Sequence, residues 1–118
     1  MLSSNLALVL AFLPPSVRSG RTERVAITGE VDLMSAGELE LRLRRVIAQS
    51  GCRTIVLDLG GLEFIDARGV SVLLAAKLAA EEAGRDLQVT NAHGLPARVL
   101  RLLGLESWCR ADAGEGDR

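Results

Sequence analysis

The distribution of apolar and polar positions predicts four strands in this chain. A continuous apolar run over residues 6–13 predicts the first strand, and the PPSVRSGRTE segment that follows is typical of a loop. The next segment, RVAITGEVDL over residues 24–33, alternates well enough to predict a second strand, which would form a hairpin with the first. The segments RTIVLDL (53–59) and LQVTN (87–91) predict two more strands.

A first helix is predicted between the second and third strands. Its apolar residues recur at the spacing i, i+4, i+7 and i+8, which places them on one helical face: Leu39, Leu43, Val46 and Ile47. Ser35 and Glu38 have the spacing of a capping box at its start. Ser50 and Gly51 should end this helix, with Gly51 in the left-handed conformation that glycine tolerates.

Two further helices follow the third and fourth strands. The second has apolar residues at helical spacing (Val70, Leu73, Leu74 and Leu78) and should end at Gly84. The third covers residues 94–105, with Pro96 in its first turn and Gly104 just after its end. Its predicted buried stripe consists of Val99, Leu100 and Leu103.

The order of these elements, β-β-α-β-α-β-α, predicts an α/β fold in which helices pack on a mixed β-sheet. Residues 1–110 should form a single domain, and the small polar residues 111–118 a disordered tail. The chain has 118 residues, of which 48% are hydrophobic and 25% charged, so it can bury a substantial core.

Charge and aromatic content exclude some classes of function. The net charge is −1, with 14 basic and 15 acidic residues, so nothing favours direct binding to nucleic acid. Aromatic residues are 3% of the chain and tyrosine is absent, which argues against a platform for stacking bases. We expect no cofactor and no metal site, because two cysteines and one histidine do not supply a ligand set.

The cellular location is predicted to be cytoplasmic. The apolar run 6–13 is similar to the core of a signal peptide, but no Lys or Arg precedes it and the following residues make a poor cleavage site. It is too short to span a membrane, and no membrane association is expected. Cys52 and Cys109 are interpreted as ordinary thiols in a reducing compartment, with a redox pair as the alternative.

The most informative segment is GLEFIDARGV, residues 61–70, where a strand-like stretch leads into a helix. Neither G-x-S-x-G nor a phosphate-binding glycine motif occurs, and His93, the lone histidine, is interpreted as a loop or cap residue. Asp66 precedes the helix, where a carboxylate caps free N–H groups. Carboxylate chemistry would need convergence of several acids, which their spacing does not establish: Asp32, Asp58, Glu63 and Asp66.

Three segments resemble the STAS domain of bacterial anti-sigma factor antagonists (anti-anti-sigma factors). GEVDL (29–33) is similar to the family's G-E-[LIV]-D motif. VLDLGGLEFIDARGVSVLL (56–74) resembles its central strand, loop and helix, which carry D-[ST]-[ST]-G. LQVTNAHGLPARVLRLLGL (87–105) is similar to its last strand and helix.

The resemblance implies a cytoplasmic regulator without enzymatic activity. It would bind an anti-sigma factor, often a serine kinase with a histidine-kinase-like ATPase fold, and so release a sigma factor to regulate transcription. The family's phosphoacceptor position is Ala67 in this chain, and the next position is Arg68, so no phosphorylation is expected at either residue. Ser71 lies one turn further along and is a poor substitute.

The partner surface implied by the resemblance consists of residues 29–33 and 62–71. Its candidate residues are Glu30, Asp32, Asp66, Ala67, Arg68, Gly69 and Ser71. A scaffold subunit of a signalling assembly or of a lipid-transporting ABC system is the alternative, and a small enzyme or ligand-binding protein is a third possibility. A homodimer is also considered, because an apolar first strand at a sheet edge would favour strand pairing.

Overall fold

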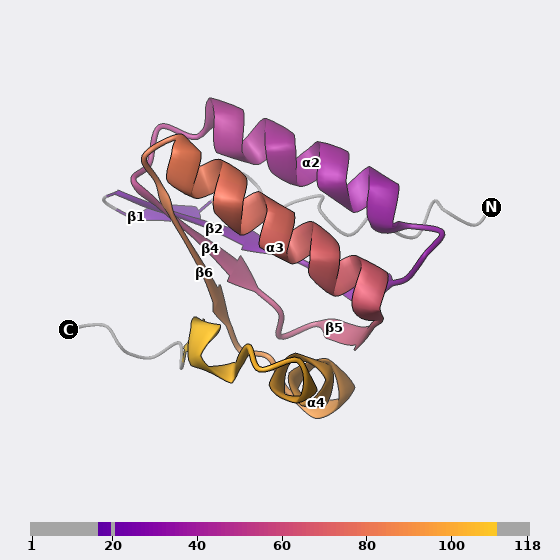
Figure 1. The fold of residues 1–118 in the computed structure, drawn as a ribbon. Helices are drawn as coiled ribbons and strands as arrows, with labels where there is room; N and C mark the ends of the chain where they lie inside the picture. Colours follow the sequence, from indigo (N-terminus) through magenta and orange to yellow (C-terminus); the bar gives the residue numbers. More distant parts are fainter. Residues whose placement is uncertain (1–16, 20, 111–118) are drawn as a thin grey trace.

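A computed structural model describes residues 17–19 and 21–110 of the chain (Figure 1). The elements follow one another in this order: β1 (Val17–Ser19), β2 (Thr22–Ala26), β3 (Gly29–Val31), α2 (Ala36–Gln49), β4 (Thr54–Asp58), β5 (Leu62–Ile65), α3 (Ala67–Glu82), β6 (Asp86–Thr90), α4 (Gly94–Leu102), the 3-10 helix η1 (Glu106–Trp108) and β7 (Cys109–Arg110).

The main sheet has the strand order β1-β2-β4-β6-β7, and a separate pair is formed by β3 and β5. Strand β1 runs antiparallel to β2, whereas all other pairings are parallel. This arrangement confirms the predicted α/β class and the mixed sheet. Parallel neighbours require crossover connections, and helices α2, α3 and α4 supply them.

The core lies between the sheet and the helices α2 and α3, which pack side by side (Figure 1). Three buried residues at the same level of the sheet form its centre, Val25, Leu57 and Val89. The predicted stripe of the first helix also points inward, since Leu39, Leu43 and Ile47 are buried and Val46 is partly buried. Helix α4 lies apart from this pair and contacts β5.

The N-terminal predictions need correction. The segment 14–23 was expected to be a loop, yet it contains β1, which pairs antiparallel with β2, and the first two residues of β2 itself. The strand predicted for residues 6–13 lies outside the described residues. The segment 24–33 is two strands, because Gly29 adopts a φ of 84° and the chain leaves the main sheet before β3 begins.

Several details of the helices also differ from expectation. Ser35 precedes α2 but makes no capping hydrogen bond through its side chain, so the predicted capping box is wrong. Gly51 is not left-handed, because α2 ends in an extended residue, Ser50. The second and third predicted helices end close to Gly84 and Gly104 as expected, and these two glycines have a positive φ, at 78° and 77°.

The predicted buried stripes of the later helices hold only in part. Leu100 is fully buried, but Leu103 is 51% exposed and Leu78 is 61% exposed. Among residues 17–19 and 21–110, no helix has the length and apolar character needed to cross a lipid bilayer.

Candidate functional site

The β3–β5 pair brings the starts of helices α2 and α3 to the same edge of the protein. The two strands are parallel and Val31 is level with Ile65, so the next residues, Asp32 and Asp66, leave the ladder at equivalent positions. The backbone N–H of Asp66 also donates to the carbonyl of Val31 at 3.2 Å. Two segments separated by more than thirty residues in the sequence therefore form one continuous surface.

Asp66 caps helix α3 as the sequence predicts. Its carboxylate Oδ1 accepts a hydrogen bond from the backbone N–H of Gly69 at 2.9 Å. This bond satisfies a backbone donor that the helix leaves free, and it places negative charge at the positive end of the helix dipole. Ala67 and Arg68, the next two residues, are both exposed.

Asp32 organises the loop before α2 in a similar way. Its Oδ1 accepts hydrogen bonds from the backbone N–H groups of Met34 and Ser35, at 3.0 and 3.1 Å. This Asx-type turn precedes the helix, and the Ser35 hydroxyl accepts a bond from the N–H of Asp32 instead of capping α2. The turn leaves the side chains of Leu33 and Met34 65% and 84% exposed.

Gly69 allows α3 to start directly on the β3–β5 ladder. A Cβ at this position would lie 2.7 Å from Cγ1 of Ile65 and 2.8 Å from Cγ1 of Val31. Both distances are shorter than real carbon contacts, so the close approach of helix and strands requires glycine. The remaining predicted residues lie on the outside, since Glu30 and Ser71 are exposed.

Ser71 follows Ala67 by one helical turn. Its hydroxyl donates to the carbonyl oxygen of Ala67 at 3.1 Å, a bond typical of serine within a helix. The hydroxyl is therefore tied to the helix backbone and does not extend into the position of the Ala67 side chain.

The four candidate carboxylates do not form a shared catalytic centre. Asp32 and Asp66 are used as caps, and Glu63 is exposed on β5. Asp58 belongs to a different network, in which it binds Arg24 at 3.1 Å and Asn91 at 3.1 Å. Among the described residues no group of three or more His, Cys, Asp or Glu side chains could hold a metal ion.

Two polar features outside the predicted surface hold the loops beyond the main sheet. Asn91 adopts a positive φ of 64° and donates to Asp58, while the N–H of Gly60 donates to the same carboxylate at 2.9 Å. The Nε2 of His93 lies 2.8 Å from the carbonyl oxygen of Gly60, a bond in which the imidazole N–H donates. His93 is the residue before α4, in agreement with its interpretation as a loop or cap residue.

The fold separates the two cysteines. Cys109 pairs with Val89 and so lies level with Leu57, whereas Cys52 precedes Thr54 at the other end of β4. The rise from Thr54 to Leu57 alone is about 10 Å, which exceeds the ~7 Å Cα separation that a disulfide tolerates. Both thiols are free, and they do not form an intrachain disulfide.

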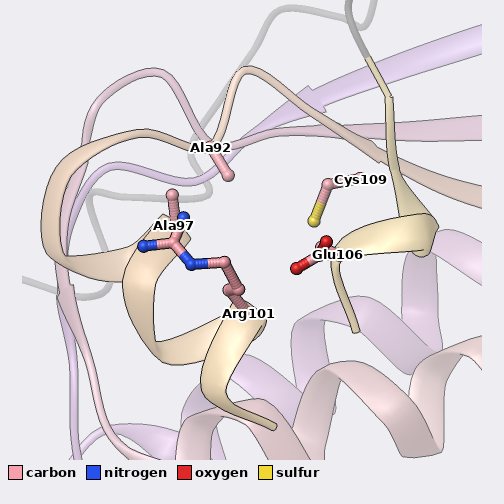
Figure 2. A pocket seen from close by; sticks show the side chains of 5 residues that line it. All are labelled: Ala92, Ala97, Arg101, Glu106 and Cys109. Carbon is pink, nitrogen blue, oxygen red and sulfur yellow. The ribbon is translucent and has the colours of Figure 1, made fainter. Parts of the chain in front are cut away.

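Cys109 lines a shallow cavity of about 210 Å³ between α4 and the C-terminal segment (Figure 2). The other lining residues are Ala92, Ala97, Arg101 and Glu106. Burial, followed by the negative charge of Glu106, raises the pKa of the Cys109 thiol above its ordinary value. The thiol is therefore held in its unreactive protonated form and is not an activated nucleophile.

An exposed apolar pair, Leu33 and Met34, adds to the predicted surface. Leu33 ends the predicted range 29–33 but was not among the candidate residues, and Met34 lies just outside that range, although both apolar residues are visible directly after the VD dipeptide. Together with Arg68 and Ala67, they make the edge a mixed apolar and charged surface. Such a composition suits protein binding, in which apolar contacts supply affinity and charges supply specificity.

Comparisons with known proteins agree with this geometry. The family model described as "Mlab, STAS domain" matches residues 16–109. An anti-sigma F factor antagonist of Paenibacillus polymyxa is 27% identical over 81 residues, which cover 69% of each chain.

Solved structures share the fold at lower identity. Unphosphorylated SpoIIAA, an anti-sigma factor antagonist, has a TM-score of 0.70 at 20% identity over 83% of this chain and 85% of its own. An antagonist from Mycobacterium paratuberculosis has a TM-score of 0.70 at 24% identity over 81% and 80%. A sulfate transporter family protein from Wolinella succinogenes has a TM-score of 0.65 at 18% identity over 86% and 84%.

Proposed function

The chain belongs to the STAS domain family, and we propose that it is an anti-sigma factor antagonist. In this role it binds an anti-sigma factor, frees the sigma factor and so regulates transcription. The anti-sigma factor is expected to be a serine-kinase type with a histidine-kinase-like ATPase fold. The chain itself acts by binding in the cytoplasm, not by catalysis, and it needs no cofactor.

One observation carries the proposal: the parallel pairing of β3 with β5, which joins two exposed segments into one docking edge. We define the docking edge as the seven residues predicted from the sequence together with Leu33 and Met34. Asp32 and Asp66 hold its backbone in place, and Arg68 supplies a positive charge. The partner would cover the apolar pair and meet Arg68 with an acidic group.

The family resemblance gives the docking edge a switch that this chain has lost. A phosphorylated side chain at position 67 would add a charge of about −1.5 to −2 beside the carboxylate of Asp66 and repel the partner. Ala67 has no hydroxyl, and the hydroxyl of Ser71 is engaged with the helix backbone. We therefore propose that the antagonist is permanently competent to bind, or is regulated by another route.

A quantitative pull-down from the native host tests the docking edge. With ATP removed so that no kinase acts, wild type and Ala67→Ser should recover the anti-sigma factor, since unphosphorylated serine is small and uncharged, whereas Ala67→Asp should reduce recovery about tenfold through repulsion beside Asp66. Arg68→Glu should have a similar effect, and Arg45→Glu, an exposed charge reversal on α2, is the matched control. Equal recovery by all four variants would show that the partner does not bind at this edge.

A second candidate is a STAS subunit of a signalling assembly or of a lipid-transporting ABC system. It is favoured by the description of the matching family model, which names Mlab, and by the similar fold of a sulfate transporter family protein. In this role the protein would not depend on phosphorylation, so an alanine at position 67 would not affect its function. The same pull-down would support this alternative if it recovered a transporter ATPase in place of an anti-sigma factor and if Arg68→Glu reduced the recovery of that ATPase.

A further inference from the structure

Helix α4 has an outer face on which exposed side chains remain among residues 17–19 and 21–110. Pro96 and Leu100 point into the core and are buried, which fixes the orientation of the helix. On the outer side Leu95 is 44% exposed and Leu102 is 76% exposed. These two leucines are seven positions apart, so they lie on the same side of the helix over two turns.

Helix α4 itself carries two basic side chains and no acidic one. Arg98 lies between the two leucines on the helix surface, and Arg101 follows it at the next turn. The sequence from residue 87 to residue 105 has no Asp or Glu, although the whole chain has 15 acidic residues. The first acid beyond this stretch, Glu106, lies across the cavity from Arg101 (Figure 2).

The α4 face is separate from the docking edge. Helix α4 packs against β5 and stands apart from α2 and α3, whose N-terminal ends form that edge (Figure 1). A molecule bound to the outer side of α4 therefore need not contact Asp66 or Arg68. The protein can present two surfaces at the same time.

We propose that the outer face of α4 binds an acidic amphipathic helix of a second protein partner. The partner's apolar side chains would pack on Leu95 and Leu102, and its carboxylates would pair with Arg98 and Arg101. Charge complementarity selects this occupant, because an apolar stripe with guanidinium groups beside it matches a helix whose apolar stripe is flanked by Asp or Glu. The antagonist would thereby link the anti-sigma factor to another component.

An anionic membrane is a weaker fit to the same residues. Binding to an anionic membrane through charge alone takes a cluster of about four to eight basic residues, so two arginines on a helix held against the domain give little affinity. The short α4 also cannot rotate its buried Pro96 and Leu100 toward lipid without leaving the core. A helix of a partner protein can bind to the side of α4 that is already exposed, without any movement of α4.

The test uses the full chain and two synthetic fluorescein-labelled peptides. One is an amphipathic helix with Leu at i, i+3, i+4 and i+7 and Glu elsewhere, and the other has Lys in place of every Glu. Fluorescence anisotropy should show saturable binding of the Glu peptide and at least tenfold weaker binding of the Lys peptide. Raising the salt from about 0.05 to 0.5 M should weaken the Glu peptide severalfold.

Variants locate the binding to α4. The double variants Leu95→Gln/Leu102→Gln and Arg98→Glu/Arg101→Glu should each weaken binding of the Glu peptide at least tenfold. Leu41→Gln is the matched control, because Leu41 on α2 is 67% exposed, and it should leave binding within about twofold. None of these changes should alter anti-sigma factor recovery, which keeps this result independent of the proposed function.

Several results would overturn the proposal. These are equal binding of both peptides, equal loss in Leu41→Gln, and no saturable binding up to about 1 mM. One such result is that the protein binds neither peptide but co-sediments with vesicles of phosphatidylcholine and phosphatidylglycerol. If Arg98→Glu/Arg101→Glu abolished this co-sedimentation, the face would be assigned to membranes. Another is that the protein binds neither peptide but self-associates. If Leu95→Gln/Leu102→Gln abolished this self-association, the face would be assigned to a second copy of this chain.

Discussion

The backbone N–H of Asp66 donates to the carbonyl of Val31, which joins the start of α3 to the strand that leads into α2. Together with the pairing of β3 and β5, this bond fixes the relative position of two loops that lie far apart in the sequence. The docking edge is therefore a property of the β3–β5 ladder, and its stability depends on a few residues whose contributions can be measured. Trp108, the only tryptophan in the chain, provides a fluorescence signal for unfolding because its indole N–H binds the carbonyl of Leu87.

Replacing the capping carboxylate should destabilise the fold without unfolding it. Asp66→Ala removes the acceptor for the Gly69 N–H and should lower the free energy of unfolding by about 1 kcal/mol. Asp66→Asn keeps an acceptor oxygen and should lower the free energy of unfolding by only about 0.3 kcal/mol. Urea denaturation followed by Trp108 emission measures both, and equal losses in the two variants would contradict a capping role.

Adding a single methyl group at Gly69 should be costly. Gly69→Ala places a carbon under 3.0 Å from both Ile65 and Val31, so the free energy of unfolding should fall by about 1–3 kcal/mol. Gly37→Ala is the control, because nothing lies within 4 Å of the position that its Cβ would take, and the change should stabilise by about 0.5 kcal/mol. A Gly69→Ala protein as stable as wild type would show that the helix can move away from the ladder.

The network around Asp58 should contribute more to stability than an exposed acid does. Asp58→Ala removes the carboxylate that binds Arg24, Asn91 and the Gly60 N–H, and we expect a loss of about 1–3 kcal/mol in the free energy of unfolding. Asp86→Ala is the control, since Asp86 is exposed and its side chain accepts a bond from Gln88. Similar unfolding midpoints for the two variants would contradict the central role of Asp58.

The raised pKa of Cys109 predicts slow alkylation and a loss of stability at alkaline pH. Burial and Glu106 disfavour the thiolate in the folded protein, so the unfolded chain ionises first, near pH ~8.5, and stability falls as the pH rises above this value. In a Cys52→Ala background, Glu106→Gln should shift the iodoacetamide pH–rate profile to lower pH. An unchanged profile would exclude the influence of Glu106.

Restoring a hydroxyl at position 67 should restore phosphorylation. After incubation with the anti-sigma kinase and ATP, mass spectrometry should find no phosphate on residues 66–69 of the wild type, but a phosphate on Ala67→Ser. The exposed N-terminal turn of α3 gives a kinase access to that position. Phosphate on Ser71 of the wild type would contradict the loss of the switch.

Local pattern was sufficient to predict the helices and the central strands. The apolar stripes led to α2 and α3, and the Asp66 cap followed from its position before a helical repeat. The pattern of apolar and polar residues failed where a strand forms only by pairing with another strand that is distant in the sequence. The LEFI segment becomes β5 only because GEV lies beside it, and the strand predicted for 24–33 is interrupted because Gly29 takes a left-handed conformation that its neighbours do not reveal.

The candidate site shows the same division. The family resemblance led to Asp32, Asp66 and Ala67 from motif positions, but the exposure of Leu33 and Met34 depends on the Asp32 turn. Ser35 had the right spacing for a capping box, yet the carboxylate of Asp32 accepts the Ser35 N–H that the side chain of Glu38 would have accepted in that box. The outcome of such competition depends on the direction in which the preceding strand ends, which periodicity does not encode.

The separation of the β3–β5 pair from the main sheet has an evolutionary consequence. Side chains at positions 67 and 68 can be exchanged without rebuilding the framework, because they point outward from a ladder held by backbone bonds. A substitution that adds or removes a hydroxyl or a charge at position 67 or 68 can therefore arise while the β3–β5 framework stays the same.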